Sequence, residues 1–371
     1  MSVVHATGRR LPIRILGSGP VALAFAGFAR RQGIPAGEIV LESETGPVPA
    51  ELAARTLALS HGSWQLLSRI TRLPQAAPIS TVDVTLSALA GHVRISASEM
   101  GVDALGQVTR YSELMVALRQ GLERLGLAPA QPGTMQDAQP SEVIVHAQGD
   151  CGPDASELRF AQQALIAEVQ IDNDAARVPP GTAFECFTPD GPLALLPAPR
   201  PGRYALVWCD RPERTRKRAE LDGAQLAQQL QRAFGWRLGR IAFVDKPQCV
   251  PMVRRARREL VRGNEVWIGN AAQALHPVAG QGLNLGLRDA FELAQWLGLA
   301  RAQGHESTQA LQHYARARRN DRQGAILLTD TLARVFSIRA LRPLQALALT
   351  SLDLLPPARR ALASHLMFGM R

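Results

Sequence analysis

The sequence of 371 residues has few aromatic residues, almost no lysine and no long apolar run. Phe, Trp and Tyr make up only 5% of it, and Lys217 and Lys246 are its only lysines, so arginine supplies nearly all the positive charge behind a net charge of +10. No apolar stretch approaches the roughly 18 residues of a membrane-spanning helix. The N-terminus also lacks the charged, apolar and small-residue sections of a signal peptide. We therefore expect neither an integral membrane protein nor a secreted one.

Cysteine is also scarce. The four cysteines, at positions 151, 186, 209 and 249, are far apart and form no CxxC pair, which argues against a zinc ribbon and a disulfide framework. The histidines show no spacing typical of a metal site. Free cysteines fit a reducing compartment, so we expect a cytoplasmic protein without a bound metal.

The excess of positive charge has three interpretations: binding of nucleic acid, binding of an anionic membrane surface, or a solvated surface. Basic residues cluster at 211–218, 254–262 and 315–322. No aromatic residue interrupts these runs, and no nucleic-acid-binding motif is present. For each run alone we favour a solvated face, and we expect no nucleic-acid partner.

The first motif lies between two short apolar stretches, at 13–16 and 38–42. It reads GSGPVA, a GxGxxG pattern with alanine at the last position, and a helix of small residues follows it. The strand, the glycine-rich turn, the helix and the second strand form a βαβ unit of about 30 residues, the context that a dinucleotide-binding fingerprint requires. An ordinary βα turn is the alternative, and the whole unit favours the fingerprint.

Each residue of this motif has a physical role in such a unit. Gly17 permits the tight turn, Gly19 lets the backbone approach a pyrophosphate, and Ala22 keeps the helix close to the strand. The N-terminus of the helix faces the phosphates. Glu42 ends the second strand 25 residues after Gly17, where a carboxylate can bind a ribose hydroxyl.

The second motif is more specific and covers residues 266–289, VWIGNAAQALHPVAGQGLNLGLRD. Gly269 ends a predicted strand, and Gly280 and Gly282 precede a helix that begins near Leu283. A loop with two glycines before a helix N-terminus presents backbone N–H groups to an anion or to an electron-rich ring edge. The pyrimidine ring of a flavin, which gains negative charge on reduction, is a group of this kind.

The rest of the chain changes character along its length. Alternating apolar and polar residues with Pro and Gly turns predict antiparallel strands at 79–97 and 161–250, interrupted by one helix near 220–234. Parallel α/β structure returns at 265–270, and the last third is helical. We expect an α/β fold with a Rossmann-like cofactor domain interrupted by an antiparallel β-rich substrate domain. The predicted boundaries are 1–78, 98–160 and 251–337 for the first domain, 79–97 and 161–250 for the second, and 338–371 for a C-terminal helical segment.

Taken together, the motifs resemble those of the group A flavoprotein monooxygenases of the para-hydroxybenzoate hydroxylase type. Within that family the chain is most similar to the ubiquinone-biosynthesis aromatic hydroxylases of the 2-octaprenyl-6-methoxyphenol hydroxylase branch. The resemblance covers nearly the whole chain, and its strongest segments are 14–24, 54–67, 101–114, 182–197, 269–290 and 313–324. It implies FAD as cofactor, NAD(P)H and O2 as co-substrates, and hydroxylation of a phenolic ring that carries a polyprenyl tail.

The resemblance also implies roles for individual residues. In the family, the first motif and its acidic residue bind the ADP part of FAD, and the second motif caps the pyrimidine ring. The implied cofactor-binding residues are Gly17, Gly19, Pro20, Val21, Ala22, Glu42, Arg55, Gln107, Gly269, Asn270, Gly280, Gly282, Leu283 and Asn284. The implied catalytic residues, beside the reactive edge of the flavin, are Arg55, His276 and Pro277. For His276 a loop histidine without a chemical role is the alternative.

Two positions depart from the family pattern. Asn270 occupies the place of the family's aspartate, and Gln148 replaces the aspartate of the usual Ala-Asp-Gly motif; neither carries a charge. These departures leave two other hypotheses open: a reductase with the same fold, and a non-catalytic assembly subunit.

Three further features keep alternatives open. Trp208 and Phe187 either line a substrate pocket or pack in the core. The Leu- and Arg-rich segment 338–371 either lies peripherally on the inner face of the membrane or packs on the cofactor domain. In the membrane alternative, the leucines expected to enter the lipid are Leu344, Leu347, Leu349, Leu352 and Leu355. The resemblance also leaves open whether other proteins of ubiquinone biosynthesis are partners.

Overall fold

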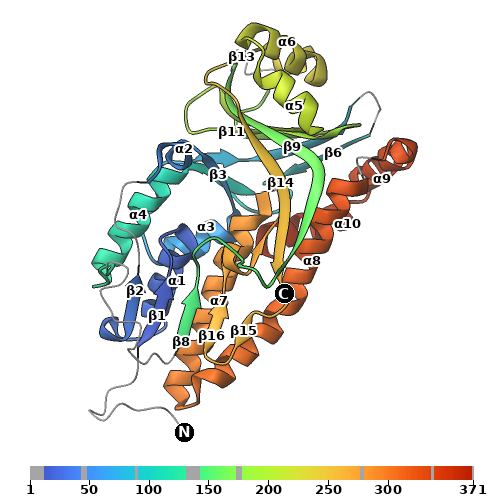
Figure 1. Cartoon of the computed structure of the whole chain (residues 1–371). Coiled ribbons are helices and arrows are strands. Elements are labelled where there is room, and N and C mark those ends of the chain that lie inside the picture. Colours follow the sequence, from blue (N-terminus) through green and yellow to red (C-terminus); the bar gives the residue numbers. More distant parts are fainter. Residues whose placement is uncertain are drawn as a thin grey trace.

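Figure 1 shows the computed structural model of the chain, an α/β protein with a parallel sheet in its lower part and a large, mostly antiparallel sheet in its upper part. The predicted fold class is thereby confirmed. The structure describes residues 12–42, 48–87, 91–130, 143–172, 178–275, 280–335 and 338–369.

The lower sheet has five strands in the order β15-β16-β8-β1-β2, and only the pair β15-β16 is antiparallel. Its strands are β1 (Ile13–Leu16), β2 (Ile39–Glu42), β8 (Val143–His146), β15 (Val261–Arg262) and β16 (Glu265–Trp267). Successive side chains of a strand point to opposite faces. On β1, Ile13 and Ile15 are fully buried and Arg14 and Leu16 are not, so one face of the sheet carries the core.

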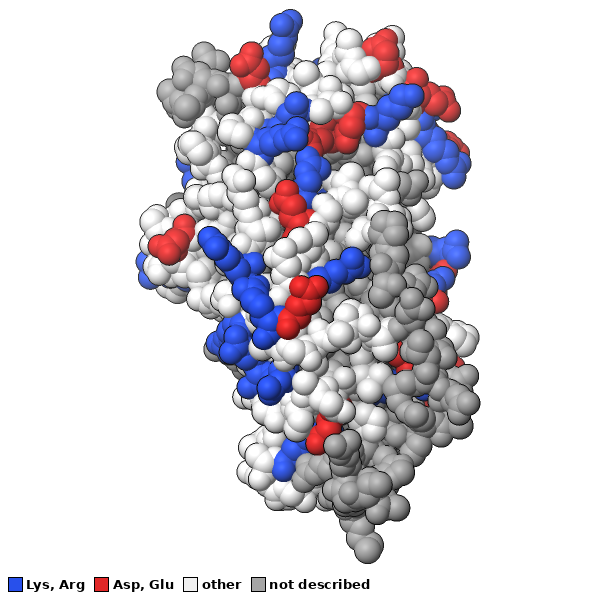
Figure 2. Space-filling model, turned by 90° about the vertical axis from the view of Figure 1, so that its left-hand side faces the viewer, with Lys and Arg blue, Asp and Glu red and all other residues white. Residues whose placement is uncertain are grey.

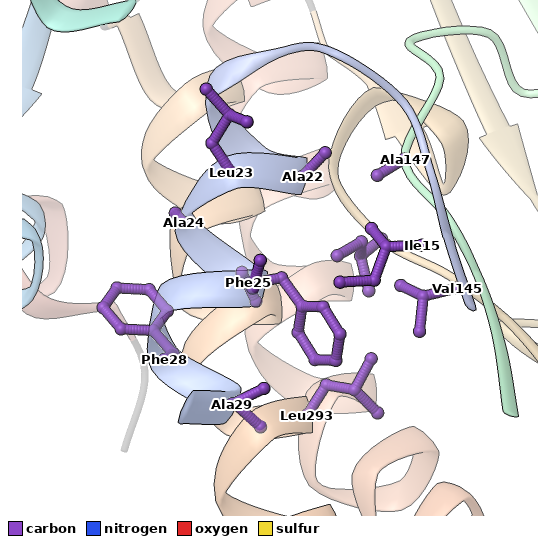
Figure 3. Close-up of a cluster of buried hydrophobic side chains, with 14 of the residues drawn as sticks. Ile15, Ala22, Leu23, Ala24, Phe25, Phe28, Ala29, Val145, Ala147 and Leu293 are labelled. Atoms are coloured by element: carbon purple, nitrogen blue, oxygen red, sulfur yellow. The ribbon is translucent and has the colours of Figure 1, made fainter. Parts of the chain in front are cut away.

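Two helices, α1 (Pro20–Arg31) and α7 (Gln281–Gln303), pack on that core. Every residue of α1 from Ala22 to Ala29 is buried. In Figure 3, Phe25 of α1 points toward Ile15 of β1 and Leu293 of α7, whereas Phe28 points to the opposite side of the helix. Glycine allows α7 to approach the backbone that follows β16 closely. A Cβ at Gly286 of α7 would lie 2.9 Å from the Cα of Gly269.

The upper sheet has nine strands, with the path β17-β14-β9-β12-β11-β10-β5-β6 and with β13 paired to β9. Its strands are β5 (Thr81–Leu86), β6 (His92–Ser96), β9 (Ala155–Asp172), β10 (Thr182–Thr188), β11 (Gly191–Pro197), β12 (Arg203–Asp210), β13 (Arg240–Phe243), β14 (Gln248–Arg257) and β17 (Gln273–Ala274). Strands β9 and β14 run across the domain boundaries expected near residues 160 and 250. The division into domains therefore stays a prediction.

Two helices cover the outer face of this sheet, α5 (Pro212–Ala219) and α6 (Gly223–Phe234), where the sequence predicted one. A new helix begins because the side chain of Asp222 accepts a hydrogen bond from the backbone N–H of Gln225, 2.7 Å away, and so caps α6. Leu226 and Leu230 of α6 are buried against Leu206 of the sheet.

A third, three-stranded sheet in the order β3-β7-β4 accompanies the parallel sheet. The strands are β3 (Thr56–Ser60), β4 (Ala77–Ile79) and β7 (Gly106–Arg110), and the helices near them are α2 (Ala50–Ala53), α3 (His61–Ser68) and α4 (Tyr111–Arg124). Val108 of β7 packs in one cluster with Ala183 of the upper sheet and Met367 near the C-terminus. The small sheet therefore joins the lower and upper parts.

The last third of the chain is helical, as predicted. It consists of α8 (Ser307–Val335), α9 (Arg342–Leu354) and α10 (Pro356–Phe368). Helix α9 lies against β6, since a Cβ at Gly91 would lie 2.8 Å from the Cα of Ala346. Helix α10 packs on α3, where the ring of Phe368 meets that of His61 edge-on at 5.8 Å. No helix among the described residues combines the length and apolar character needed to cross a membrane.

Positive charge is dispersed over the face shown in Figure 2, where Lys and Arg side chains are interspersed with Asp and Glu. Two of the basic runs pair with acidic residues of other elements. In the first run Arg214 pairs with Asp190, with a distance of 2.7 Å from Nη1 to Oδ2. In the second, Arg254 pairs with Asp330, with a distance of 3.3 Å from Nε to Oδ2.

Candidate functional site

The turn between β1 and α1 contains the first predicted loop. Gly17 has a φ of +142°, and a Cβ there would lie 2.5 Å from the carbonyl oxygen of Ala147, so the turn requires glycine. Gly19 is the N-cap of α1, has no side-chain cap, and leaves open space for at least 4 Å around its Cβ position. Gly17 therefore closes the turn against protein, whereas Gly19 borders a space at a helix N-terminus that favours a phosphate.

Glu42, the predicted ribose ligand, ends β2 beside this turn. The N–H of Gly17 donates to the carbonyl oxygen of Glu42 at 3.1 Å. Both carboxylate oxygens of Glu42 accept hydrogen bonds from the guanidinium of Arg14 on β1, with Nη2 3.1 Å from Oε2. No sequence motif singles out Arg14. It orients the carboxylate, whose remaining lone pairs can still accept a bond from a ribose hydroxyl.

Helix α7 begins at the second predicted loop. Gly280 is its N-cap in the left-handed conformation, with a φ of +60°, and no described residue lies within 4 Å of a Cβ placed at Gly282. The amide oxygen of Asn284 accepts from the N–H of Ser60 at 2.8 Å, and its amide nitrogen donates to the carbonyl oxygens of Ala58 and Gly280 at 3.2 and 2.9 Å. Asn284 thus ties the loop to β3 at the N-terminus of α7, where the backbone N–H groups of the first turn have no partner within the helix itself.

The end of β16 lies beside α1. Gly269 has a φ of +59°, and a Cβ there would lie 3.0 Å from a methyl group of Val21. Its N–H donates to a carboxylate oxygen of Asp289 at 3.2 Å. The next residue, Asn270, is exposed, and its carbonyl oxygen accepts a hydrogen bond from the thiol of Cys151 at 2.9 Å. The side chain at the family's aspartate position is therefore accessible to a ligand.

A network of buried charges supports this loop. The carboxylate of Asp289 also accepts from Nε of Arg318 and from Nε2 of Gln273, both at 2.7 Å. Arg318 is only 1% exposed and pairs with Asp321 at 2.7 Å, and Arg322 donates to the amide oxygen of Gln273 at 2.7 Å. The expectation of a solvated face for the run 315–322 was therefore wrong at Arg318 and Arg322. The arginines of this run lie on two faces of one helix, one buried and one exposed. The number of charges in the run does not show which arginines are buried.

The remaining predicted residues lie around these loops. Pro20 occupies the first turn of α1, Ala22 is fully buried, and Leu283 is partly buried against the core. Arg55 is exposed between α2 and β3. Gln107 is partly buried on β7.

His276 and Pro277 lie outside the described residues. Of the two aromatic candidates, Trp208 packs away from the parallel sheet, in the cluster beneath α6, with the guanidinium of Arg218 4.0 Å from its ring centre. Phe187 points to the other face and packs near Leu349 of α9.

The residues described above fit an extended anionic dinucleotide such as FAD. Two helix N-termini, those of α1 and α7, each begin at a glycine that has no side-chain cap, with open space at Gly19 and Gly282. A Cβ at Gly286, near the start of α7, would lie 2.9 Å from a methyl carbon of Val21, near the start of α1, so the two N-termini lie at the same end of this helix pair. In the part of the chain that the structure describes, no group of three His, Cys, Asp or Glu side chains could hold a metal ion.

Comparisons with known proteins agree with this fit. A family described as an FAD binding domain matches residues 149–327. The chain is 29% identical to 3-demethoxyubiquinol 3-hydroxylase of Escherichia coli over 329 residues, which is 80% of this chain and 82% of that protein. It is 30% identical to the ubiquinone hydroxylase UbiL of Rhodospirillum rubrum over 264 residues, 68% of this chain and 59% of that one.

Solved structures share the fold at lower identity. The p-nitrophenol 4-monooxygenase of Pseudomonas putida superposes with a TM-score of 0.73 at 16% identity, over 97% of this chain and 99% of that chain. The anhydrotetracycline hydroxylase of Streptomyces rimosus gives 0.65 at 19% identity, over 97% and 76%. Over most of its length the chain is therefore similar to hydroxylases of ubiquinone biosynthesis, and its residues 149–327 match an FAD-binding family.

Proposed function

We propose that the chain hydroxylates the ring of a polyprenylated phenol in ubiquinone biosynthesis, with FAD as cofactor and with NAD(P)H and O2 as co-substrates. The observation that carries the proposal is the match to the Escherichia coli hydroxylase over 80% of the chain, together with a pair of glycine-capped helix N-termini that fit FAD. When bound, FAD supplies the redox chemistry that activates O2.

The chain's own part is to bind, orient and exclude water. In this proposal Gly19 and the N-terminus of α1 hold the pyrophosphate, and Glu42, oriented by Arg14, holds the ribose. The first N–H groups of α7 bind the pyrimidine ring, and Asn270 contacts the ribityl or phosphate region. Arg55, Gln107, His276 and Pro277 keep their implied roles beside the flavin as predictions.

We also propose the division of labour between the two halves. Residues 1–78, 98–160 and 251–337 form the cofactor domain, and residues 79–97 and 161–250 form the substrate domain. Residues 338–371 form a separate C-terminal helical segment. The continuous strands β9 and β14 tie the two domains together, so we expect them to unfold as one cooperative unit.

The function is tested with purified protein, FAD, NADPH or NADH, and a phenol with a short prenyl tail. We expect a yellow protein, oxidation of the nicotinamide that the phenol accelerates, and a product heavier by one oxygen atom, which comes from 18O2. Gly19→Val serves as the matched control without flavin. A yellow protein that oxidises the nicotinamide but yields no hydroxylated product would favour a reductase, and a colourless folded protein would favour an assembly subunit.

Peripheral membrane binding fits a substrate with a lipid tail, and helix α9 offers a surface for it. Leu344 and Leu347 are each 62% exposed, and Leu354 is 74% exposed. Together with Leu355 these residues recur at helical spacing on one face. Of the five predicted leucines, Leu349 and Leu352 instead pack toward the upper sheet, because the opposite face of α9 is anchored to β6.

Arginine contributes less to this surface than the sequence indicated. Arg342 donates to the carbonyl oxygen of Ser87, and Arg359 pairs with Glu99 at 2.8 Å. We therefore propose that the exposed leucines, rather than the charge, provide most of the binding to lipid. In co-sedimentation with vesicles of phosphatidylethanolamine and phosphatidylglycerol, the double variant Leu344→Ser/Leu347→Ser should lose most of the bound fraction. The control Leu327→Ser, at an exposed leucine of α8, should keep it; equal losses would contradict the role of α9.

A further inference from the structure

The upper sheet has two faces with different surroundings. On β10, Phe184 and Cys186 point to the outer face, in the cluster beneath α6. Ala183 and Phe187 point to the inner face: Ala183 packs with Val108 of the small sheet, and Phe187 packs near α9. Because side chains of a strand alternate, Glu185 points to the inner face, between these two contacts.

The inner face is connected to the candidate flavin loop. Ala183 shares a cluster with Ala58 of β3. The carbonyl oxygen of Ala58 accepts a hydrogen bond from Asn284, and a Cβ at Gly280 would lie 3.6 Å from the Cβ of Ala58. One hydrophobic cluster therefore includes residues of the strand that carries Glu185 and of β3, which holds the N-terminus of α7. The carboxyl group follows Ala183 by two residues on the same face.

The surroundings of Glu185 are apolar. Its neighbours on the adjoining strands are Val84 of β5 and Ala194 of β11. No described residue forms a hydrogen bond or an ion pair with its carboxyl group, and burial among these groups raises its pKa to about 7. The residue nevertheless keeps part of its surface accessible. A carboxyl group that is removed from bulk water, has no protein partner and borders accessible space is free to meet a ligand.

Other ionisable groups on the inner face differ from Glu185 in their chemistry or in having a protein partner. Burial raises the pKa of the Cys209 thiol on β12 to about 12. Glu168 of β9 is paired with Arg110, and Arg342 at the start of α9 is bonded to the carbonyl oxygen of Ser87. Among these groups, Glu185 is therefore the carboxyl group for which no described residue provides a partner.

We propose that the carboxylate of Glu185 binds the phenolic hydroxyl of the substrate and accepts its proton as a general base. This inference rests on the proposed function and adds to it the residue that orients the ring. The O–H bond of the phenol breaks, an O–H bond forms on the carboxylate, and the electron pair stays on the phenolic oxygen. The ring gains electron density, which favours attack at the carbon that receives oxygen.

The first test is kinetic. Glu185→Gln keeps the shape of the side chain but cannot accept a proton, so kcat/KM for a short-tailed prenyl phenol should fall by about 100-fold or more. In the wild type kcat/KM should rise with pH through about 7, and in Glu185→Gln this rise should disappear. Glu185→Asp should restore part of the rate together with a pH-dependent rise. The control Glu213→Gln, at an exposed carboxylate of α5, should match the wild type.

The second test needs no turnover. Binding of 2-prenylphenol and of its methyl ether to the oxidised holoprotein is followed through the change in flavin absorbance. Wild type should prefer the phenol above pH 7 by about tenfold, a difference of ~1.4 kcal/mol, and Glu185→Gln should bind both ligands alike. A wild type that hydroxylates no phenol but shows this preference would overturn the proposed function alone. Equal pH profiles and equal ligand preference in wild type and Glu185→Gln would overturn the role of Glu185.

Discussion

Asp289 beneath the cofactor loop and Glu185 on the inner face of the upper sheet are both withdrawn from water, yet their surroundings differ. Asp289 accepts hydrogen bonds from a guanidinium, an amide and a backbone N–H. Glu185 has no protein partner among the described residues and keeps an accessible surface. Breaking a buried pair leaves an uncompensated charge, so the first carboxylate supports the fold. The second keeps its hydrogen-bonding capacity for a ligand.

The same contrast separates the two glycines of the first loop. Gly17 is pressed against the backbone of Ala147, and Gly19 faces open space. In both comparisons, the residue that is bonded to or packed against other parts of the protein has a structural role. The residue that borders accessible space indicates a binding role. Four substitutions test how far this rule holds.

The largest effect is expected from Asp289→Ala. It removes one of the carboxylate partners of Arg318, whose guanidinium is almost fully buried, and it leaves the N–H of Gly269 without its acceptor. The free energy of unfolding should fall by about 3–5 kcal/mol, measured by urea denaturation. The control Asp172→Ala, at an exposed residue of β9, should change it by no more than about 0.5 kcal/mol. Similar losses in both variants would remove the distinction between paired and exposed carboxylates.

Gly19→Val should abolish flavin binding without unfolding the protein, because a side chain there fills the space proposed for the pyrophosphate. We expect FAD affinity to fall by roughly 100-fold or more, about 2.8 kcal/mol, as measured by flavin fluorescence on binding. Gly17→Val should instead destabilise the fold, since its side chain meets the backbone of Ala147. A folded Gly19→Val protein with full flavin occupancy would show that the phosphate site is assigned wrongly.

Glu185→Gln should make the protein more stable above neutral pH. The folded state holds the proton of Glu185 up to a pH of about 7 and the unfolded state loses it near 4.5. The ionised carboxyl therefore destabilises the folded state progressively as pH rises through this window. The melting temperature of the variant should exceed that of the wild type at pH 8.5, and the difference should shrink toward pH 4.5. A constant difference at all pH values would indicate that Glu185 has a partner.

The smallest effect is expected from Asn270→Asp, which restores the charge typical of the family. The side chain is exposed and an asparagine amide can still donate and accept hydrogen bonds. FAD affinity should change by no more than about tenfold, ~1.4 kcal/mol, as measured by titration of the protein freed of flavin. A wild type that binds no FAD and a variant that does would instead favour the assembly subunit.

The sequence predicted the parts of the fold that depend on local patterns. The βαβ unit around Gly17, the glycine loop before α7 and the helical last third follow from periodicity and turn chemistry, and the structure confirms them. The sequence could not predict contacts between segments that are distant along the chain. Arg14 reaches Glu42 across two strands, and Arg318 meets Asp289 across two helices. Both pairs depend on which faces the fold brings together.

For the same reason the sequence did not indicate Glu185, and it left undecided whether Trp208 lines a substrate pocket or packs in the core. Both residues belong to strands in which apolar and polar residues alternate. This alternation predicts that the two faces of the sheet differ, but it does not predict which face meets the cofactor domain. That choice is made by helix α6, which covers the outer face, and by the small sheet, which meets the inner face. The side chain of Asn284 likewise proved to bind β3, because its position on α7 is fixed by tertiary packing.

The separation of helices α1 and α7 along the chain has a consequence for synthesis on the ribosome. Helix α1 is buried along nearly its whole length, but α7, which covers it, begins roughly 250 residues after α1 ends, a delay of about 10 to 50 s at the usual rates of translation. During that interval its apolar surface, including Phe25 and Phe28, lacks the partner that buries it in the finished protein. The nascent chain therefore presents a chaperone with a binding site near its beginning, and slowing translation between residues 42 and 281 should lengthen that association.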